Sequence, residues 1–300
     1  MRYSDSGWSE KEAKKCEESF KKAWYPTIQH YAYFANGNWE TAALQTNMAI
    51  AVFCNDRELF ESTVKYSVNG AGNGSIPHMI VYPSGQCQET TRAQHYAQLG
   101  IGLLTGAAEI AWNQGVDLYG WNDNRILKGF EYTAKYGLGE EVPFQTYLDR
   151  TGKYGLGGRH QNYTEISTVS RGRFWPIFER IQNHYTNRRN VSAPYSSKVV
   201  KIKRPEGHSS DYVGHGTLTH WRKPIKATKS FLSPGVPSGL INQNLNDGIK
   251  MLHKSMASLS ISSISCCSIF VSFPFAVVLS CFAIIYFPFP ASFNFLVICC

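Results

Sequence analysis

The distribution of charge along the chain constrains its fold more than any other feature. All 30 Lys and Arg residues and all 22 Asp and Glu residues lie at or before Lys254, so the 46 residues that follow carry no charged side chain. The chain also has 7 Trp, 17 Tyr and 17 Phe, which is too aromatic for a disordered polypeptide. We therefore expect a folded body at residues 1–225, a linker at 226–254 and a separate hydrophobic tail at 255–300.

Apolar residues recur at helical spacing through the body. A capping box, Ser9-Glu10-Lys11-Glu12, opens the first predicted helix, and Pro26 is expected to disturb its end. Further helices are predicted over 39–53, 57–68, 88–112, 124–136 and 175–185. Loops rich in Gly and Asn join them in pairs, and few segments alternate as strands do. The sequence therefore predicts an all-α fold of paired antiparallel helices, but its periodicity does not separate a bundle, a solenoid and an α/α toroid.

The predicted helix over 88–112 contains the first candidate site. Its beginning is polar, and Gln88, Arg92 and Tyr96 recur every four residues, so they are expected on one helix face with His95 beside them. A guanidinium, a phenol and an imidazole would then converge. The alternative interpretation is a helix end whose polar groups bond to the neighbouring backbone. The segment before this helix, 69–77 (NGAGNGSIP), is expected to be a long exposed connection.

The second candidate is the segment 36–40, NGNWE, where a loop ends and a helix begins. The first N–H groups of a helix favour an anion, and Asn38 adds an amide and Trp39 an indole that can stack on a sugar ring. The alternative interpretation is an ordinary N-cap, with Asn38 bonding to the first turn.

Several classes of function have no motif in this sequence. A net charge of +8 favours an acidic partner, but no nucleic-acid-binding motif accompanies it. Neither a phosphate-binding glycine loop nor a metal-binding spacing such as H-E-x-x-H is present, so we expect neither phosphate chemistry nor a tight transition-metal site. Residues 1–9 have no apolar segment typical of a signal peptide, although Asn73, Asn162 and Asn190 begin glycosylation sequons.

Long segments of the body resemble the alginate lyase-like family of polysaccharide lyases. They read GNWETAALQTNMAIAVFCNDRELF, NGAGNGSIPHMIVYPSGQCQETTRAQHYAQLGIG and AEIAWNQGVDLYGWNDNRILKGFEYTAKYGLGEEVPF, and the likeness continues through RGRFWPIFERIQNHY, PYSSKVV, KRPEG and GHGTLTHWR. The resemblance implies an α/α toroid, complete or incomplete, in an extracellular enzyme without an organic cofactor. It also implies β-elimination of a uronic-acid polysaccharide of the alginate or glucuronan type.

The resemblance also implies roles for individual residues. Asn38 is similar to the amide that neutralises the sugar carboxylate, Arg92 to the arginine of the second motif, and Tyr96 to the acid and base tyrosine. The family pattern has an Asn-His pair in the first motif or a histidine in the second helix, and Gly37-Asn38 lacks the pair. The resemblance therefore leaves the base that removes the C5 proton open, with Tyr96 and His95 as the candidates. Substrate-binding residues are expected at Trp39, Gln45, Gln88, His184 and Tyr185.

Two other functions remain open at this stage. A glycoside hydrolase of the same fold class would need two carboxylates, for which Glu40, Glu89 and Asp117 are available. A catalytically inactive protein would bind the anionic polysaccharide without cleaving it. The tail at 255–300 is expected to be either a membrane segment or translated non-coding sequence, and the body to be a truncated copy of a longer enzyme. Membrane association is expected only if the tail is genuine.

Overall fold

The structure is a computed structural model in which residues 7–32, 35–148 and 162–221 are described, together with the backbone of 283–286 and 295–298. The predicted linker at 226–254 and most of the predicted tail at 255–300 therefore lie outside the described residues. Within the described residues, no helix combines the length and the apolar character needed to cross a bilayer.

Helices make up most of the described chain, so the prediction of an all-α fold is confirmed. The first half contains α1 (Glu10–Ser19), η1 (Phe20–Trp24), α2 (Tyr25–Ile28), α3 (Gly37–Phe53), α4 (Arg57–Asn69) and α5 (Ile76–Met79). Further along the chain come α6 (Gln94–Asn113), α7 (Trp121–Gly137), α8 (Phe178–Ile181), η2 (Gln182–Arg188), α9 (Pro194–Lys203) and α10 (Gly216–Thr219).

Two short antiparallel strand pairs accompany the helices. In the first, β1 (Tyr147–Leu148) pairs with β2 (Asn162–Tyr163), and Tyr147 lies opposite Tyr163. In the second, β3 (Ala283–Tyr286) pairs with β4 (Phe295–Ile298). Neither pair forms a sheet large enough to cover the helical core.

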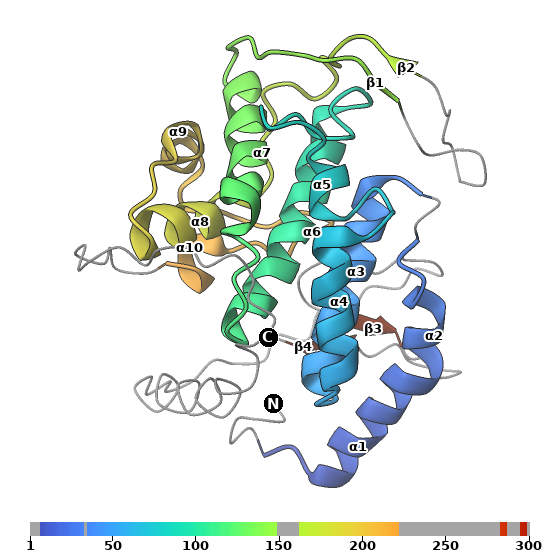
Figure 1. Cartoon of the computed structure of the whole chain (residues 1–300). Coiled ribbons are helices and arrows are strands. Elements are labelled where there is room, and N and C mark those ends of the chain that lie inside the picture. Colours follow the sequence, from blue (N-terminus) through green and yellow to red (C-terminus); the bar gives the residue numbers. More distant parts are fainter. Residues whose placement is uncertain (1–6, 33–34, 149–161, 222–282, 287–294, 299–300) are drawn as a thin grey trace.

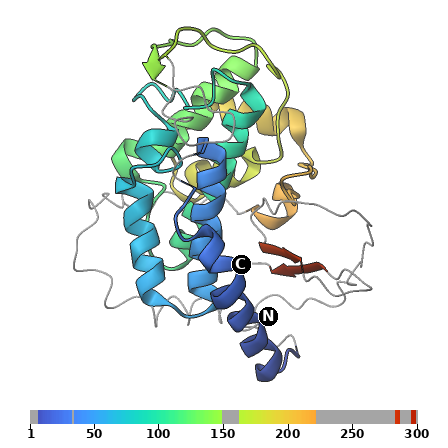
Figure 2. The ribbon, with the colours of Figure 1, turned by 90° about the vertical axis from the view of Figure 1, so that its right-hand side faces the viewer.

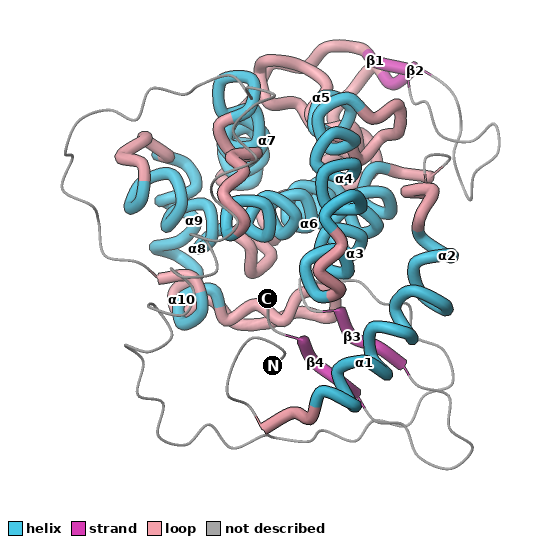
Figure 3. The backbone as a smooth tube through the Cα atoms, turned by 60° about the horizontal axis from the view of Figure 1, so that its bottom comes forward, coloured by secondary structure: helices cyan, strands magenta, loops and turns pink. Residues whose placement is uncertain are grey.

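The long helix α6 lies in the middle of the molecule (Figure 1). Figure 3 shows it running between the α3–α4 hairpin on one side and α8 and α9 on the other. In Figure 2, α3 and α4 run side by side and α1 extends below them. Because α6 packs against neighbours on several sides, its apolar part is buried, with Ile101, Leu104 and Ala107 closed to solvent.

The N-terminal helix begins as predicted but does not stop at Pro26. Ser9 and Glu12 form the capping box, with the Glu12 amide donating to Ser9 Oγ at 3.3 Å. The helix then widens into the π-helix η1 and continues as α2, in which Pro26 occupies the first turn. A proline in a first turn has no amide that the helix would need, so the chain stays helical to Ile28.

The prediction of a long exposed connection at 69–77 is wrong. Residues 72–76 are buried, and a short helix, α5, begins at Ile76. The polar and glycine-rich composition of this segment does not reflect exposure to water, because the segment packs against α3 around the buried carboxylate of Glu40.

The central helix begins later than predicted. Residues 88–92 form turns, Ala93 is the N-cap in extended conformation, and α6 starts at Gln94. The prediction that Gln88, Arg92 and Tyr96 share one helix face is therefore wrong. The two hydrogen bonds from the amides of Arg92 and Ala93 to the Glu89 carbonyl close a turn instead.

Candidate active site

The beginning of α3 is fixed against the turn that precedes α6. The Gly37 amide donates to Gln88 Oε1 at 3.1 Å. A Cβ on Gly37 would lie 2.6 Å from Met79 Sδ and 2.9 Å from the Asn73 carbonyl oxygen, so a residue without a side chain is required for this close approach. This hydrogen bond fixes the beginning of α3 against Gln88, which lies 51 positions further along the chain.

The glycine-rich loop after α4 supports the same segment from the other side. Glu40, in the first turn of α3, is fully buried and accepts hydrogen bonds from the Gly74 amide and the Tyr66 hydroxyl, each at 2.5 Å. Asn73 Nδ2 donates to the Ala35 carbonyl at 2.9 Å. A Cβ on Gly72 would lie 1.8 Å from Glu40 Oε1, so this glycine lets the loop reach the carboxylate.

One buried carboxylate joins the two candidate motifs. Glu89 is fully buried, and its Oε2 accepts a hydrogen bond from the Asn38 amide at 2.7 Å. Its other oxygen, Oε1, lies 2.5 Å from Arg92 Nη1. The beginning of α3 and the turn before α6 therefore meet at Glu89.

Arg92, His95 and Tyr96 lie together, as the sequence predicts, although not on one helix face. The Arg92 guanidinium carbon lies 4.2 Å from the centroid of the Tyr96 ring. The His95 and Tyr96 rings are 4.1 Å apart at a tilt of 41°. A cation over the face of a tyrosine ring is attracted by the ring quadrupole, so the two side chains hold one another in place.

A later segment of the chain covers the first turns of α6. Gln94 Nε2 donates to the Ser167 carbonyl at 2.8 Å, and Gln98 Nε2 donates to the Arg173 carbonyl at 2.7 Å. His95 Nδ1 lies 3.0 Å from Ser170 Oγ. Burial, Arg92 and Arg173 lower the pKa of His95, so its imidazole is neutral at neutral pH and is able to accept a proton.

The candidate residues differ in their access to solvent. Trp39 is 43% exposed and the Arg92 side chain is 27% exposed, whereas Asn38 is 3% exposed. Asn38 Oδ1 has no hydrogen-bond partner within the described part of the chain. Gln45 and Gln88, also expected to bind substrate, are 3% exposed and lie below the surface. Arg92, His95 and Tyr96 are all half-buried, so together with Trp39 they form the accessible part of this site.

The structure does not bring His184 and Tyr185 to this site. His184 is 1% exposed and stacks on Tyr119 with ring centroids 3.7 Å apart, and the Tyr185 hydroxyl donates to the Tyr119 carbonyl at 2.8 Å. Burial, together with Arg188 and Arg189, lowers the pKa of His184 to about 2. Both rings pack against Tyr119 and not against Glu89, Arg92 or Tyr96, so we assign both to the core.

The sequence offered Glu89 only as a possible hydrolase carboxylate, and it gave no role to Arg173, which lowers the pKa of His95. For Glu89 a signal exists, because it precedes Arg92 by three residues, a spacing at which opposite charges often pair. For Arg173 no local pattern exists, since it comes from a turn 77 residues after Tyr96.

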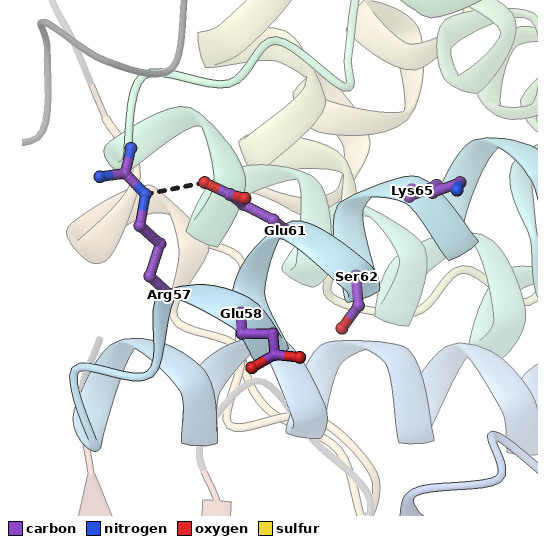
Figure 4. Close-up of a pocket in the computed structure, with 5 residues that line it drawn as sticks. All are labelled: Arg57, Glu58, Glu61, Ser62 and Lys65. Atoms are coloured by element: carbon purple, nitrogen blue, oxygen red, sulfur yellow. Dashed lines mark hydrogen bonds and ion pairs between the residues drawn. The ribbon is translucent and has the colours of Figure 1, made fainter. Parts of the chain in front are cut away.

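A separate hollow lies on the surface of α4 and is lined by Arg57, Glu58, Glu61, Ser62 and Lys65 (Figure 4). Its residues all come from one helix, and Arg57 Nε pairs with Glu61 Oε1 at 2.7 Å on the open surface. It has no residue in common with the site around Glu89. Across the described residues, no group of three or more His, Cys, Asp or Glu side chains gathers as a metal site.

The geometry defines a mostly helical protein in which the buried Glu89 carboxylate contacts the Asn38 backbone and the Arg92 guanidinium, and the Tyr96 and His95 rings lie next to Arg92. Residues 3–144 match the family model of alginate lyase, which confirms the resemblance over the part of the chain that contains Asn38, Arg92, His95 and Tyr96. This match implies a polysaccharide lyase. No curated protein and no solved structure matches the chain.

Proposed function

We propose that this protein cleaves a uronic-acid polysaccharide of the alginate or glucuronan type by β-elimination. The family match over residues 3–144 and the cationic and phenolic groups of the site support this proposal. As a member of a typically extracellular family, it would act on polysaccharide outside the cell.

The reaction requires three contributions from the site. The C5 proton is removed, the electrons of the C5–H bond form a C4=C5 double bond, and the C4–O4 bond breaks as O4 takes a proton. Negative charge develops beside the C5 carboxylate, so hydrogen bonds or a cation must stabilise it there. We assign this stabilisation to Asn38 and Arg92, and the proton transfers to Tyr96, with His95 as the alternative base.

The observation that carries this proposal is the contact of Arg92 with both Glu89 and the Tyr96 ring. The guanidinium carbon lies 4.2 Å from the centroid of that ring, so a cation lies beside the phenol to which we assign the proton transfers. Trp39 supplies an exposed aromatic surface next to Asn38 for a sugar ring. Since Asn38 is 3% exposed, its contact with a sugar carboxylate requires the side chains that cover it to shift.

The available acids favour elimination over hydrolysis. A glycoside hydrolase needs two carboxylates facing the scissile bond. Glu40 and Glu89 are fully buried and bonded to backbone amides, and Asp117 is paired with Arg189 and with the Gly120 amide. All three acids thus have structural partners.

The test is to incubate the protein with alginate, glucuronan and pectate while following ultraviolet absorbance from the unsaturated product. We expect at least one substrate to give the absorbance, and Tyr96→Phe to reduce the rate by about 100-fold or more, since the phenol transfers the protons.

Tyr195→Phe is the matched control, because the Tyr195 hydroxyl bonds to Glu140 at 3.0 Å on an exposed surface of α9. It should retain the wild-type rate. New reducing ends without ultraviolet absorbance would show hydrolysis, and a Tyr96→Phe variant as active as wild type would remove the assignment of the base to Tyr96.

A further inference from the structure

The carboxylate of Glu89 has an unusual environment for an acidic side chain. It is fully buried, yet it lies between an amide of α3 and a guanidinium from the turn before α6. A carboxylate withdrawn from water is costly unless it is paired and hydrogen-bonded. Here each oxygen has a partner, at 2.7 Å for Asn38 N and 2.5 Å for Arg92 Nη1.

The two partners of Glu89 are two residues to which the proposed function gives direct roles. The hydrogen bond to the Asn38 backbone sets where the first turn of α3 begins. The ion pair to Arg92 sets where the guanidinium lies, and the carbon of that guanidinium is 4.2 Å from the centroid of the Tyr96 ring. Because one planar carboxylate makes both contacts, it fixes the distance between the backbone N–H of Asn38 and the guanidinium of Arg92.

The charge of Glu89 also matters for the orientation of Arg92. The Arg92 side chain is 27% exposed, and without an ionic partner its guanidinium would have a hydrated alternative pointing into solvent. A charge-assisted hydrogen bond is about twice as strong as a neutral one, so the ion pair favours the inward position.

We propose that Glu89 is a positioning residue for the elimination reaction, holding Asn38 and Arg92 at the separation that the uronate carboxylate requires. This inference rests on the proposed function. Glu89 itself takes no proton from the substrate and contacts no sugar, because both of its oxygens are bonded and closed to solvent.

Two substitutions separate a charge role from a structural one. Glu89→Gln keeps the length of the side chain and an acceptor for the Asn38 amide, but loses the ion pair. Glu89→Asp keeps the charge but shortens the side chain by one methylene. If Glu89 only fills space and accepts a hydrogen bond, Gln is the milder change; if its charge positions Arg92, Asp is the milder change.

The experiment measures kcat and KM for each variant of the full chain, on whichever of alginate, glucuronan and pectate the wild type cleaves. Thermal unfolding of each variant is measured alongside. We expect Glu89→Gln to lower kcat at least tenfold and Glu89→Asp to recover part of that loss. Glu131→Gln is the matched control, because Glu131 also accepts two backbone amides, those of Tyr195 and Ser196, away from the site. It should keep the wild-type kcat.

Each result has a defined meaning. Glu89→Gln with a kcat equal to or above that of Glu89→Asp, or both variants within twofold of wild type, overturns the positioning role while leaving the lyase function intact. A wild-type protein that releases no unsaturated product overturns the proposed function and this inference with it. If Glu89→Gln does not fold, a folded Glu89→Asp variant decides: a kcat within about tenfold of wild type supports the role, and a loss of 100-fold or more contradicts it.

Discussion

Arg92 makes two contacts of different kinds with one planar group. Its Nη1 pairs with Glu89 Oε1 at 2.5 Å while the guanidinium carbon lies 4.2 Å from the centroid of the Tyr96 ring. A lysine ammonium is a compact point charge and cannot donate along one edge while stacking its face on a ring. The shape of the guanidinium, and not only its charge, therefore matters at this position.

We expect Arg92→Lys to lower kcat/KM by about tenfold or more, because the loss of the stacked geometry leaves the cation displaced from the developing charge. Steady-state kinetics from ultraviolet absorbance measure the change. Arg57→Lys is the matched control, since Arg57 pairs with Glu61 on the open surface of α4 (Figure 4). Equal kcat/KM values for the two variants would contradict a geometric role for Arg92.

At the scale of elements, the position of the site depends on a loop that approaches a buried acid. Gly72 and Gly74 have no side chain where the loop passes Glu40, and a Cβ on Gly72 would meet that carboxylate at 1.8 Å. Gly72 does not have a positive φ angle. Glycine is therefore needed at this position because a side chain would clash with Glu40, and not because of the backbone conformation.

We predict that Gly72→Ala destabilises the protein by about 1–3 kcal/mol, the usual cost of forcing extra atoms into a packed site. Gly207→Ala is the matched control, since a Cβ there meets nothing within 4 Å. It should change the free energy of unfolding by less than about 0.5 kcal/mol. Urea unfolding of both variants provides the comparison, and a Gly72→Ala variant as stable as Gly207→Ala would show that the loop adapts freely.

Helices were predicted well where apolar periodicity within the segment determines the structure. They were predicted poorly where contacts with a distant part of the chain determine it. The bounds of α4 lie within one residue of the prediction over 57–68, because its apolar spacing and the Asp56 cap are contained in the segment. Residues 88–92 have helical spacing but form turns, because their polar groups bond to α3 through Gln88 and Glu89. Similarly, no local pattern reveals that the 69–77 loop is buried around Glu40.

The candidate site was predicted in part. Arg92, His95 and Tyr96 are neighbours in sequence, so their proximity needs no tertiary information. Their link to Asn38 through Glu89 depends on the packing of α3 against α6, which no spacing within either segment determines. His184 and Tyr185 were expected at the site from the family resemblance, and their burial against Tyr119 depends on packing that no local sequence pattern indicates.

At the scale of the whole molecule, the chain after β2 contains two buried groups that titrate. Glu206 is 5% exposed and accepts hydrogen bonds from the Phe178 and Glu179 amides. Burial, with an opposing contribution from those amides and a further rise from the Glu179 carboxylate, raises the pKa of Glu206 to about 7. His184, stacked on Tyr119, has its pKa lowered to about 2.

These shifts change stability in opposite directions with pH. The ordinary pKa of Glu206 is 4.5, so its favourable contribution is full below pH 4.5 and is lost as the pH rises towards 7. The ordinary pKa of His184 is 6.5, so its contribution is present above pH 6.5 and is lost as the pH falls towards 2. Between pH 4.5 and 6.5 the two contributions have opposite slopes of about 1.4 kcal/mol per pH unit each and largely cancel.

Because the two contributions cancel, we predict that replacing either Glu206 or His184 alone reveals how the other group makes stability depend on pH. Glu206→Gln keeps an acceptor for the Phe178 and Glu179 amides but cannot titrate, so its stability relative to wild type should rise from pH 4.5 to 6.5, by up to about 1.4 kcal/mol per unit. His184→Phe keeps an aromatic ring against Tyr119, and its stability relative to wild type should fall over the same range. Urea unfolding at pH 4.5, 5.5 and 6.5 measures both differences. If the differences from wild type do not change with pH, or change in the same direction for the two variants, the buried groups do not titrate as their surroundings in the fold require.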